Sequence, residues 1–384
     1  MQDQSAPLKN VTILQVLPAL GTGGVERGTL EITEAITNAG GRALVACNGG
    51  ALSAQVRRAG GELFTLPLQS KNPLTIWKNA ALLAKLILRE RVTIVHARSR
   101  APAWAAWIAA QRTGVRFLTT YHGVYSENIP FKRLYNAVMI KGQKVIAVSH
   151  HVARMIVQRY QLPPDRIRVI HRGADLNLFN PANITGERVA RLAERWRLSP
   201  DPFPLILLPG RLTRWKGAEV LLRALARMEH RTAIMVLVGP EQGNGHFSKH
   251  LIELAHQLGV APRLRIAGNC DDMQAAYQMA DVVVAPSLQP EPFGRTVVEA
   301  QAMGRIVVAS SHGGAAETIE HGVTGFLVPP GDVAMLAGAL DYVLGLSPGR
   351  RAEFGEQARQ SVARHFAKET MQAATIEVYR ELLG

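Results

Sequence analysis

Two glutamates, Glu291 and Glu299, lie eight residues apart in the stretch EPFGRTVVEA, on either side of a Pro-Phe-Gly-Arg turn. Pro290 and Pro292 delay the helix that follows, so its first turn is expected to present unpaired N–H groups. That expected turn consists of Phe293, Gly294, Arg295 and Thr296. A carboxylate at Glu291 can accept hydrogen bonds from sugar hydroxyls, and Glu299 can take both hydroxyls of a ribose. Alternatively, both glutamates only complement the helix dipole or form surface pairs, which contribute ~1 kcal/mol or less.

Two cations stand upstream in LLPGRLTRWKG, at residues 207–217. Arg211 and Lys216 are five residues apart across a short turn at the end of an expected strand, so both side chains can reach one point above that strand. Arginine binds two phosphate oxygens in a bidentate manner, and lysine adds a mobile point charge. The two residues therefore fit a diphosphate, although two solvated surface cations are the alternative.

Two further motifs lie in the first half of the chain. In LPALGTGGVERGT an expected strand ends in a glycine turn, where Gly23 and Gly24 leave N–H groups open to an anion at a helix N-terminus. The spacing is not the GxGxxG of a dinucleotide fingerprint, and a tight turn that requires glycine is the alternative. His122 ends the strand RFLTTYH and can bond a substrate hydroxyl or phosphate, unless it is structural.

Each of these motifs ends an expected strand, and the chain alternates strands with helices throughout. In the first half, the strand at residues 11–18 precedes a helix over residues 25–38, and the alternation continues to RIRVIHRG. The pattern restarts at residues 202–212, with helices expected over 216–228, 247–257 and 272–279. Such alternation predicts parallel sheets covered by helices on both faces.

We therefore expect an α/β protein of two Rossmann-like, doubly wound lobes, with the ligand in the cleft between them, outside the carboxyl ends of the strands. The expected first lobe spans residues 1–185 and the second spans residues 186–365. Residues 366–384 are expected to form a helix that can cross back to the first lobe. A length of 384 residues agrees with two domains.

The charge of the chain is unevenly distributed. Residues 1–200 hold 27 Lys and Arg against 11 Asp and Glu, whereas residues 201–384 hold 17 against 19, so the net charge of +14 arises in the first half. A basic surface attracts an anionic substrate, an anionic membrane or nucleic acid, and a merely solvated basic face is the alternative. No signal peptide and no run of ~20 apolar residues is apparent, so a location on the cytoplasmic side is expected, at most peripheral to the inner membrane.

The two cysteines, Cys47 and Cys270, form no CxxC pattern, which argues against a disulfide framework and against a zinc site. No DxD pair follows a strand at the expected cleft, because Asp271 and Asp272 are adjacent. Neither a metal nor another cofactor is therefore expected.

Taken together, the motifs resemble the GT4 family of retaining glycosyltransferases with the GT-B fold. The resemblance extends over essentially the whole chain and includes GTGGVE, YHG, VSHHVARMI, VIHRGAD, GRLTRWKG, GNCDDMQAAYQMADVVVAPS and EPFGRTVVEAQAMGRIVVAS. The GR…KG motif followed by a pair of glutamates with seven residues between them is a specific signal. The opening LQVLPALGTGGVERGTLE is similar to the lipopolysaccharide-core branch of Gram-negative bacteria.

The resemblance implies a role for each motif. Arg211 and Lys216 would bind the donor diphosphate and stabilise the departing nucleotide. Glu291 would contact the transferred sugar, Glu299 would hold the ribose, and His122 would lie near the transferred sugar.

The remaining matched positions contribute mainly through the backbone. Gly23 and Gly24 match a loop that closes on the phosphate, and the main chain at Asn269 and Cys270 would frame the base. The backbone of residues 293–296 would line the sugar and the phosphate.

Two departures from the family pattern concern the donor. Arg214-Trp215 stand where the family often has a small or acidic residue, and Arg295 stands where many members have an aliphatic one. Because the additions are cationic, phosphate binding is still expected, but the donor cannot be copied from a relative. A UDP or GDP sugar is expected.

Glycosyl transfer places developing negative charge on the leaving diphosphate, so cations and helix N–H groups at that position are where catalysis is expected. Retention of configuration is implied by the family. No second carboxylate can be assigned as a nucleophile, so front-face attack by the acceptor hydroxyl is favoured. The expected acceptor is a saccharide or lipid-linked saccharide of anionic character.

Three other functions are alternatives to this one. A nucleotide-sugar epimerase on the same fold would release a free sugar or epimer without an acceptor. A non-catalytic basic binding protein is disfavoured by the intact glutamate pair, and nucleic acid is not an expected partner because aromatic residues are not interleaved with Lys and Arg. A dinucleotide dehydrogenase is least favoured because the GxGxxG loop is missing.

Overall fold

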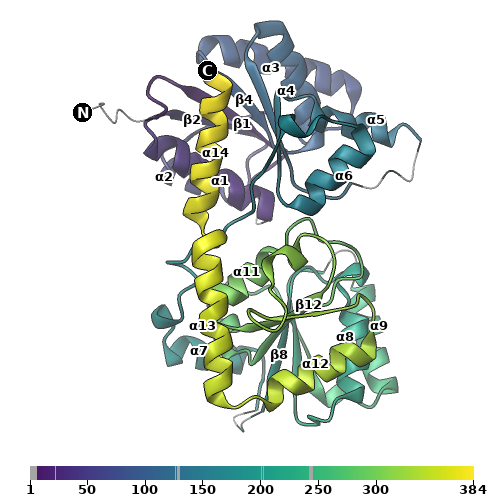
Figure 1. Cartoon of the computed structure of the whole chain (residues 1–384). Helices are drawn as coiled ribbons and strands as arrows, with labels where there is room; N and C mark the ends of the chain where they lie inside the picture. Colours follow the sequence, from purple (N-terminus) through teal and green to yellow (C-terminus); the bar gives the residue numbers. More distant parts are fainter. Residues whose placement is uncertain are drawn as a thin grey trace. The chain divides into compact units, whose positions relative to one another are not determined.

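The computed structural model in Figure 1 describes residues 7–21, 23–125, 127, 130–199, 201, 203–241 and 245–384. The chain forms two compact units. The first unit comprises Met1–Arg172 together with Lys368–Gly384, and the second comprises Gly173–Ala367.

The first unit is built on a sheet of seven strands in the order β3-β2-β1-β4-β5-β6-β7, and all neighbouring strands are parallel. The strands are β1 (Thr12–Val16), β2 (Arg42–Cys47), β3 (Glu62–Thr65), β4 (Ile94–Ala97), β5 (Arg116–Tyr121), β6 (Lys144–Ala147) and β7 (Ile167–Val169). Strand β1, TILQV, is buried at all five positions. Such continuous burial is typical of a parallel sheet with both faces covered.

Seven α-helices are described in the first unit, and their starts follow from local sequence. They are α1 (Gly24–Asn38), α2 (Ser53–Arg58), α3 (Pro73–Arg89), α4 (Arg100–Thr113), α5 (Lys132–Asn136), α6 (His150–Tyr160) and α14 (Lys368–Leu383), with the 3-10 helices η1 (Ala137–Ile140) and η2 (Pro164–Arg166). Asn72 caps α3, whose first residue is Pro73. Ser149 caps α6 by accepting from the N–H of Val152.

The C-terminal helix α14 packs beside α1 within the first unit (Figure 1). Met371, Val378 and Tyr379 of α14 share one apolar core with Ile32 and Ile36 of α1. The chain therefore leaves the second unit after residue 367 and ends in the first.

The second unit has a sheet of six parallel strands in the order β10-β9-β8-β11-β12-β13. The strands are β8 (Leu205–Pro209), β9 (Ile234–Val238), β10 (Leu264–Gly268), β11 (Val282–Ala285), β12 (Ile306–Ser310) and β13 (Phe326–Val328). The helices are α7 (Gly186–Arg195), α8 (Ala218–Arg227), α9 (His246–Gln257), α10 (Met273–Met279), α11 (Arg295–Ala302), α12 (Val333–Gly345) and α13 (Pro348–His365). The 3-10 helices are η3 (Pro181–Asn183), η4 (Arg214–Lys216), η5 (Ala261–Arg263) and η6 (Ala315–Thr318). The expected pair of Rossmann-like, doubly wound lobes is thus confirmed.

The boundary between the units lies at residues 172 and 173, not at the expected 185 and 186. The intervening residues belong to the second unit because they pack on it. The rings of Phe179 and Tyr277 are 6.0 Å apart between centroids, and Ala174 N donates to Phe366 O at 2.8 Å. The sequence predicts the boundary at the start of a polar segment, but that segment forms helix α7 of the second unit.

Each sheet has one point where the winding direction reverses. In the first sheet it lies between the neighbours β1 and β4, and in the second between β8 and β11. Ligands of open α/β sheets bind outside the carboxyl ends of the strands at such a switch point. The residues that follow these four strands are therefore the first place to look for a site.

Candidate functional site

A buried ion pair lies at the switch point of the second sheet. Lys216, the last residue of η4, follows β8, and Glu291 follows β11. The Lys216 Nζ atom is 2.7 Å from Glu291 Oε1, and the two side chains are only 13% and 8% exposed. Ser287 Oγ donates to the same Glu291 oxygen. The structure thus brings together two predicted residues that are 75 positions apart in the chain.

Close backbone contacts fix the loop that carries Lys216. Gly217 has a φ of 80°, and a Cβ atom at this position would lie 2.0 Å from the carbonyl oxygen of Pro286. Leu288 N donates to Trp215 O at 2.7 Å. These contacts hold the η4 loop against the segment between β11 and α11, so the ion pair has little freedom to separate by loop motion alone.

Arg211, predicted to act together with Lys216, follows β8 by two residues and has an exposed side chain. Within the described part of the chain, it forms no ion pair with Glu291 or Glu299. The structure therefore places Arg211 at the edge of the switch point and leaves its guanidinium available to a ligand.

Helix α11 begins at Arg295, two residues later than predicted. Gly294 precedes it with a φ of 94°, a left-handed conformation that interrupts a helix and favours glycine. Phe293 is only 3% exposed and packs against Phe366, with 6.1 Å between ring centroids. The predicted first turn is therefore wrong for Phe293 and Gly294, whereas Arg295 and Thr296 do begin the helix.

Glu299 is a second buried carboxylate, on α11. Its Oε2 atom accepts a hydrogen bond from Tyr277 Oη at 3.2 Å, and its Oε1 atom lies 3.6 Å from Arg295 Nε, one turn earlier on the helix. The two predicted glutamates thus have separate partners. Glu299 is held in place by α10, and Glu291 is held by the η4 loop.

Asn269 and Cys270, predicted to frame the base, follow β10, which lies two strands from β8 in the sheet. Asn269 is exposed, Cys270 is half-buried, and burial raises the pKa of the Cys270 thiol. Asp272 caps α10 by accepting from Ala275 N. The guanidinium of Arg188 also binds Asp272, with 2.6 Å between Nη2 and Oδ1, and this bond holds the pKa of the carboxyl below its ordinary value.

Gly23, Gly24 and His122 lie at the carboxyl edge of the first sheet, in the other unit. Gly23 is the N-cap of α1 and makes no side-chain capping bond, and Gly24 is the first helical residue. Residue 22, inside the predicted glycine turn, lies outside the described residues. His122 directly follows β5 and is half-buried. The predicted residues therefore form two sets, one on each unit.

Sequence reasoning missed three residues at these edges. Ser287 and Tyr277 each donate to one of the two glutamates. Arg98 directly follows β4, at the switch point of the first sheet, and is 1% exposed. Ser287 and Arg98 carried a usable signal, because each stands at the carboxyl end of an apolar strand. Tyr277 carried none, because only the fold brings α10 to α11.

Arg98 is an unusual buried cation. Its Nη1 atom donates to Gln15 Oε1 at 3.1 Å, but its Nε and Nη2 atoms have no hydrogen-bond partner among the described residues. Burial lowers the pKa of Arg98 to about 10. A second arginine, Arg172, lies against Gly28 of α1 and is 3.2 Å from Glu31. The first unit therefore places positive charge directly beneath the N-terminal part of α1.

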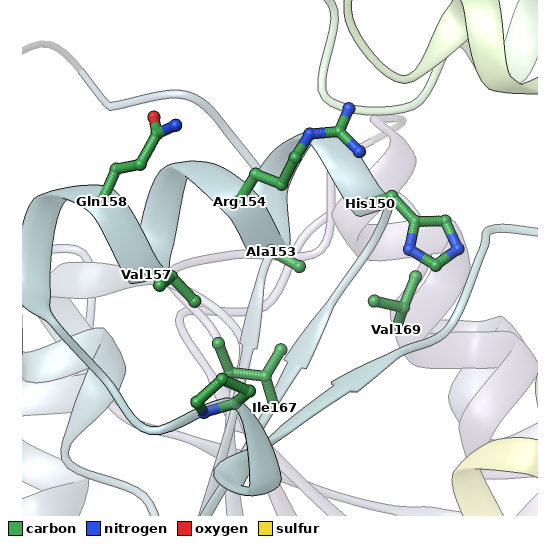
Figure 2. Close-up of a pocket in the computed structure, with 8 residues that line it drawn as sticks. His150, Ala153, Arg154, Val157, Gln158, Ile167 and Val169 are labelled. Carbon is green, nitrogen blue, oxygen red and sulfur yellow. The ribbon is translucent and has the colours of Figure 1, made fainter.

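An apolar hollow of about 360 Å³ lies at the β7 end of the first sheet. Figure 2 shows Ala153 and Val157 of α6 facing Ile167 and Val169 of β7 across it, whereas the polar end of Arg154 extends away from these apolar side chains. The hollow lies at an edge strand and away from the switch point, so it is separate from the residues predicted to do chemistry.

Comparisons with known proteins identify the class. Two family models match the chain, Glycosyltransferase Family 4 over residues 22–178 and Glycosyl transferases group 1 over residues 192–361. A glycosyltransferase of Rickettsia africae, known from a crystal structure, is 39% identical, with 97% of this chain and 98% of that chain covered and a TM-score of 0.89. D-inositol 3-phosphate glycosyltransferase 2 of Catenulispora acidiphila is 33% identical over 74% of this chain and 70% of the relative. The chain belongs to the GT4-type glycosyltransferases with the GT-B fold.

Two further solved structures are similar to this chain. The Anabaena protein HepE, solved in complex with UDP and glucose, is 25% identical, with 96% of this chain and 99% of that chain covered and a TM-score of 0.82. WaaG, a glycosyltransferase of lipopolysaccharide biosynthesis, is 18% identical over 95% of this chain and 99% of its own, with a TM-score of 0.73, which shows a shared fold. The resemblance to the lipopolysaccharide branch therefore extends to the fold and no further.

None of the described helices is long and apolar enough to cross a membrane. Among the same residues, no three His, Cys, Asp or Glu side chains are grouped so that they could hold a metal ion.

Proposed function

We propose that this glycosyltransferase moves a hexosyl sugar from a nucleoside-diphosphate sugar, of UDP or GDP type, to a hydroxyl of a saccharide or lipid-linked saccharide, with retention of configuration. The observation that carries the proposal is the buried Lys216–Glu291 pair at the β8/β11 switch point. The complex of HepE with UDP and glucose supports a donor of this kind.

In this proposal, Lys216 leaves Glu291 and binds the diphosphate when the donor binds. In the structure, Lys216 binds Glu291 at 2.7 Å. A diphosphate gives the ammonium a more highly charged partner, and Arg211 adds a bidentate contact from the exposed edge. Glu291 is then free to accept hydrogen bonds from hydroxyls of the donor sugar, while Ser287 keeps its carboxylate in place.

In the same scheme Glu299, which is oriented by Tyr277, binds the ribose. The backbone at Asn269 and Cys270, which follow β10, frames the base. The N–H groups at the start of α11, around Arg295, face developing negative charge with the positive end of a helix dipole.

The chemical step concentrates charge on the leaving diphosphate. The bond from the anomeric carbon to the phosphate oxygen breaks, and the acceptor oxygen bonds to that carbon from the same face. The acceptor proton passes to the departing phosphate oxygen. Lys216, Arg211 and the α11 N–H groups stabilise that oxygen, so the proposed reaction uses no metal. His122 and the glycine turn at Gly23 and Gly24 contact the transferred sugar and its phosphate.

We also propose an anionic acceptor in cell-envelope glycan synthesis, including lipopolysaccharide. The first unit carries 25 Lys and Arg against 11 Asp and Glu, which is the whole net charge of +14. Several similar relatives are named for D-inositol 3-phosphate, a phosphorylated acceptor. Both observations support a negatively charged group on the acceptor, received by the first unit.

Contact with an anionic membrane surface is part of the same proposal. On α3 the side chains of Leu74 and Trp77 are 75% and 62% exposed, and near α5 those of Phe131 and Leu134 are 84% and 67% exposed. Arg112 lies over the Trp77 ring at 4.6 Å. Exposed apolar side chains with cations beside them suit a headgroup region, and the apolar hollow of Figure 2 suits the hydrocarbon of a lipid-linked acceptor.

The proposal is tested by a nucleotide screen followed by a donor assay. Thermal shift with UDP, GDP, ADP and CMP is expected to single out UDP or GDP. The matching sugar donors should then be hydrolysed slowly without an acceptor, and NMR of the product should show the anomeric configuration of the donor retained. Release of an epimer, or no stabilisation by any of the nucleotides, would overturn the proposal.

A further inference from the structure

A histidine at the carboxyl end of β12 contacts the loop that carries Glu291. His312 follows β12 by two residues, and β12 pairs with β11 in the sheet. Its Nε2 atom lies 2.8 Å from the carbonyl oxygen of Ser287, the second residue after β11. Because a carbonyl oxygen only accepts hydrogen bonds, Nε2 carries the proton and donates. His312 thus holds the start of the loop between β11 and α11.

Ser287 connects His312 to the candidate site. Its side chain is buried, and its hydroxyl donates to Glu291 Oε1, the same oxygen that Lys216 binds. Because His312 holds the carbonyl group of Ser287, it restricts where the hydroxyl of that residue can lie. A chain of hydrogen bonds therefore runs from His312 through Ser287 to the carboxylate of Glu291.

The two residues after His312 hold the same loop further along, at Glu291. Gly314 N donates to the carbonyl oxygen of Glu291 at 2.7 Å. Gly313 has a φ of 70°, and a Cβ atom there would lie 2.6 Å from the backbone nitrogen of Glu291. A side chain does not fit at that distance, so glycine permits the close approach. Residues 312–314 thus contact the loop at Ser287 and again at Glu291.

The contacts of Glu291 differ in what becomes of them when a donor binds. In the proposed function Lys216 leaves Glu291 for the diphosphate. Among the described residues, the hydrogen bonds that then remain on Glu291 come from Ser287 Oγ and from Gly314 N. Only the first of these reaches the carboxylate, and it depends on the position of Ser287. The orientation of the carboxylate toward a donor sugar therefore depends on what holds Ser287.

We propose that His312 is a positioning residue for Glu291 during sugar transfer. It holds the carbonyl group of Ser287, so that the Ser287 hydroxyl keeps the carboxylate directed at the donor sugar after Lys216 has left. Its effect is confined to the sugar, because other residues bind the nucleotide in the proposed function. The inference rests on that proposed function, since it takes Glu291 as the group that contacts the transferred sugar.

The test compares nucleotide binding with turnover in the full chain. Calorimetric titration with UDP and GDP gives the dissociation constant of the nucleotide, and hydrolysis of UDP-glucose, UDP-galactose and GDP-mannose gives kcat and KM. His312→Leu should lower kcat about tenfold for the donor that wild type hydrolyses fastest, because a slightly misplaced catalytic group costs much of the rate. The dissociation constant of the nucleotide should stay within about twofold of wild type.

Two variants at histidines serve as controls. His312→Gln keeps an Nε2 atom that can donate to the Ser287 carbonyl, so its kcat should stay within about threefold of wild type. His256→Leu removes an exposed histidine of α9 and should match wild type in both measurements. Recovery by glutamine and not by leucine separates the hydrogen bond from the volume of the ring.

Ser287→Ala tests the chain of hydrogen bonds itself. Alone it should lower kcat by about the same factor as His312→Leu. Combined with His312→Leu it should add little, because both substitutions interrupt the same chain. Full additivity of the two losses would show that His312 acts by another route and would overturn the proposal.

Nucleotide binding separates a positioning role from a structural one. Wild-type kcat in His312→Leu would overturn the proposal, as would a parallel loss of nucleotide affinity and kcat, which would show general damage to the switch point. Either result leaves the proposed function intact as long as wild type binds a nucleotide and hydrolyses a donor. If wild type binds neither nucleotide, or hydrolyses none of the donors, the proposed function fails and this inference fails with it.

Discussion

The carboxyl edges of the two sheets share a topology but balance their charges differently. At the β8/β11 switch point, Lys216 and Glu291 neutralise each other at 2.7 Å. At the β1/β4 switch point, Arg98 is fully buried, and two of its nitrogens have no partner among the described residues. Under the proposal, a ligand that binds Lys216 in the second unit must therefore displace Glu291. The first unit holds a buried cation that interacts with the charges of Glu31 and Glu26 on α1.

Whole-unit charge follows the same division. The second unit has 19 Lys and Arg and 19 Asp and Glu, whereas the first has an excess of 14 positive charges. A neutral unit can bind a donor through a few placed groups without attracting anions generally, and a basic unit attracts an anionic acceptor from a distance. The charge of the second unit thus suits specific binding of a donor, whereas the charge of the first suits long-range attraction of an anionic acceptor.

The largest expected effect is on catalysis. Lys216→Ala and Glu291→Ala should each lower turnover by about 10²–10³-fold, because each removes a group that acts on the reacting sugar or on its leaving diphosphate. Steady-state transfer assays measure the effect. Lys249→Ala, an exposed lysine of the same unit, is the matched control and should keep wild-type turnover. Rates near wild type in both site variants would contradict the role of the switch point.

The next effect is on stability, and it directly distinguishes the carboxyl edges of the two sheets. Lys216→Met leaves Glu291 buried without its cation and should cost about 3 kcal/mol in the free energy of unfolding. Arg98→Met removes a fully buried cation, two of whose nitrogens have no hydrogen-bond partner among the described residues, so it should be neutral or stabilising, because methionine fills much of the same volume. Thermal and urea unfolding of both variants give the comparison. A similar loss in both would show that Arg98 is as well satisfied as Lys216.

Much of the fold was predictable from the sequence. The helices expected over residues 247–257 and 272–279 correspond to α9 (His246–Gln257) and α10 (Met273–Met279), because apolar periodicity and turn residues fix such elements locally. The helix expected over 216–228 begins at Ala218, since Lys216 ends a 3-10 turn and Gly217 is left-handed. The start of α11 was missed for the same reason, at Gly294.

The candidate site was only partly predictable. The types and spacing of Lys216 and Glu291 indicated a common ligand, but their direct contact depends on β8 and β11 being neighbours in the sheet. Arg98 was missed because a cation one residue beyond a strand is ordinarily taken as exposed. Tyr277 could not be found at all, since its contact with Glu299 joins two helices through tertiary packing.

Acid pH should destabilise the first unit through His96. This side chain is fully buried between Tyr379 Oη and Thr120 Oγ1, each at 2.7 Å, and burial together with the charges of Arg98 and Arg172 holds its pKa well below the ordinary value. The unfolded chain therefore binds a proton that the folded chain does not, and stability should fall as pH drops below ~6.5, by about 1.4 kcal/mol per pH unit.

The contribution of His96 is isolated by substitution. His96→Gln should be less stable at pH 7, because it loses hydrogen bonds, but its unfolding free energy should depend less on pH between about 6.5 and 5. Urea unfolding at several pH values measures both slopes. Equal slopes in the variant and wild type would show that His96 titrates normally in the folded protein.

The smallest expected effect concerns the ribose side of the donor site. Tyr277→Phe removes the 3.2 Å hydrogen bond to Glu299 and should weaken nucleotide binding about threefold, because the carboxylate loses its orienting partner. Calorimetric titration with whichever of UDP and GDP binds wild type measures the change. Tyr342→Phe, at a half-exposed tyrosine of the same unit, is the control. An unchanged affinity in Tyr277→Phe would place Glu299 outside the ligand contacts.

The central claim is that a donor diphosphate takes Lys216 from Glu291 at the β8/β11 switch point. Calorimetric titration of UDP and GDP into wild type, Lys216→Ala and Lys249→Ala tests it most directly. The account predicts that the preferred nucleotide binds wild type and Lys249→Ala alike, and at least about tenfold more weakly to Lys216→Ala. Equal affinity in all three proteins would contradict it.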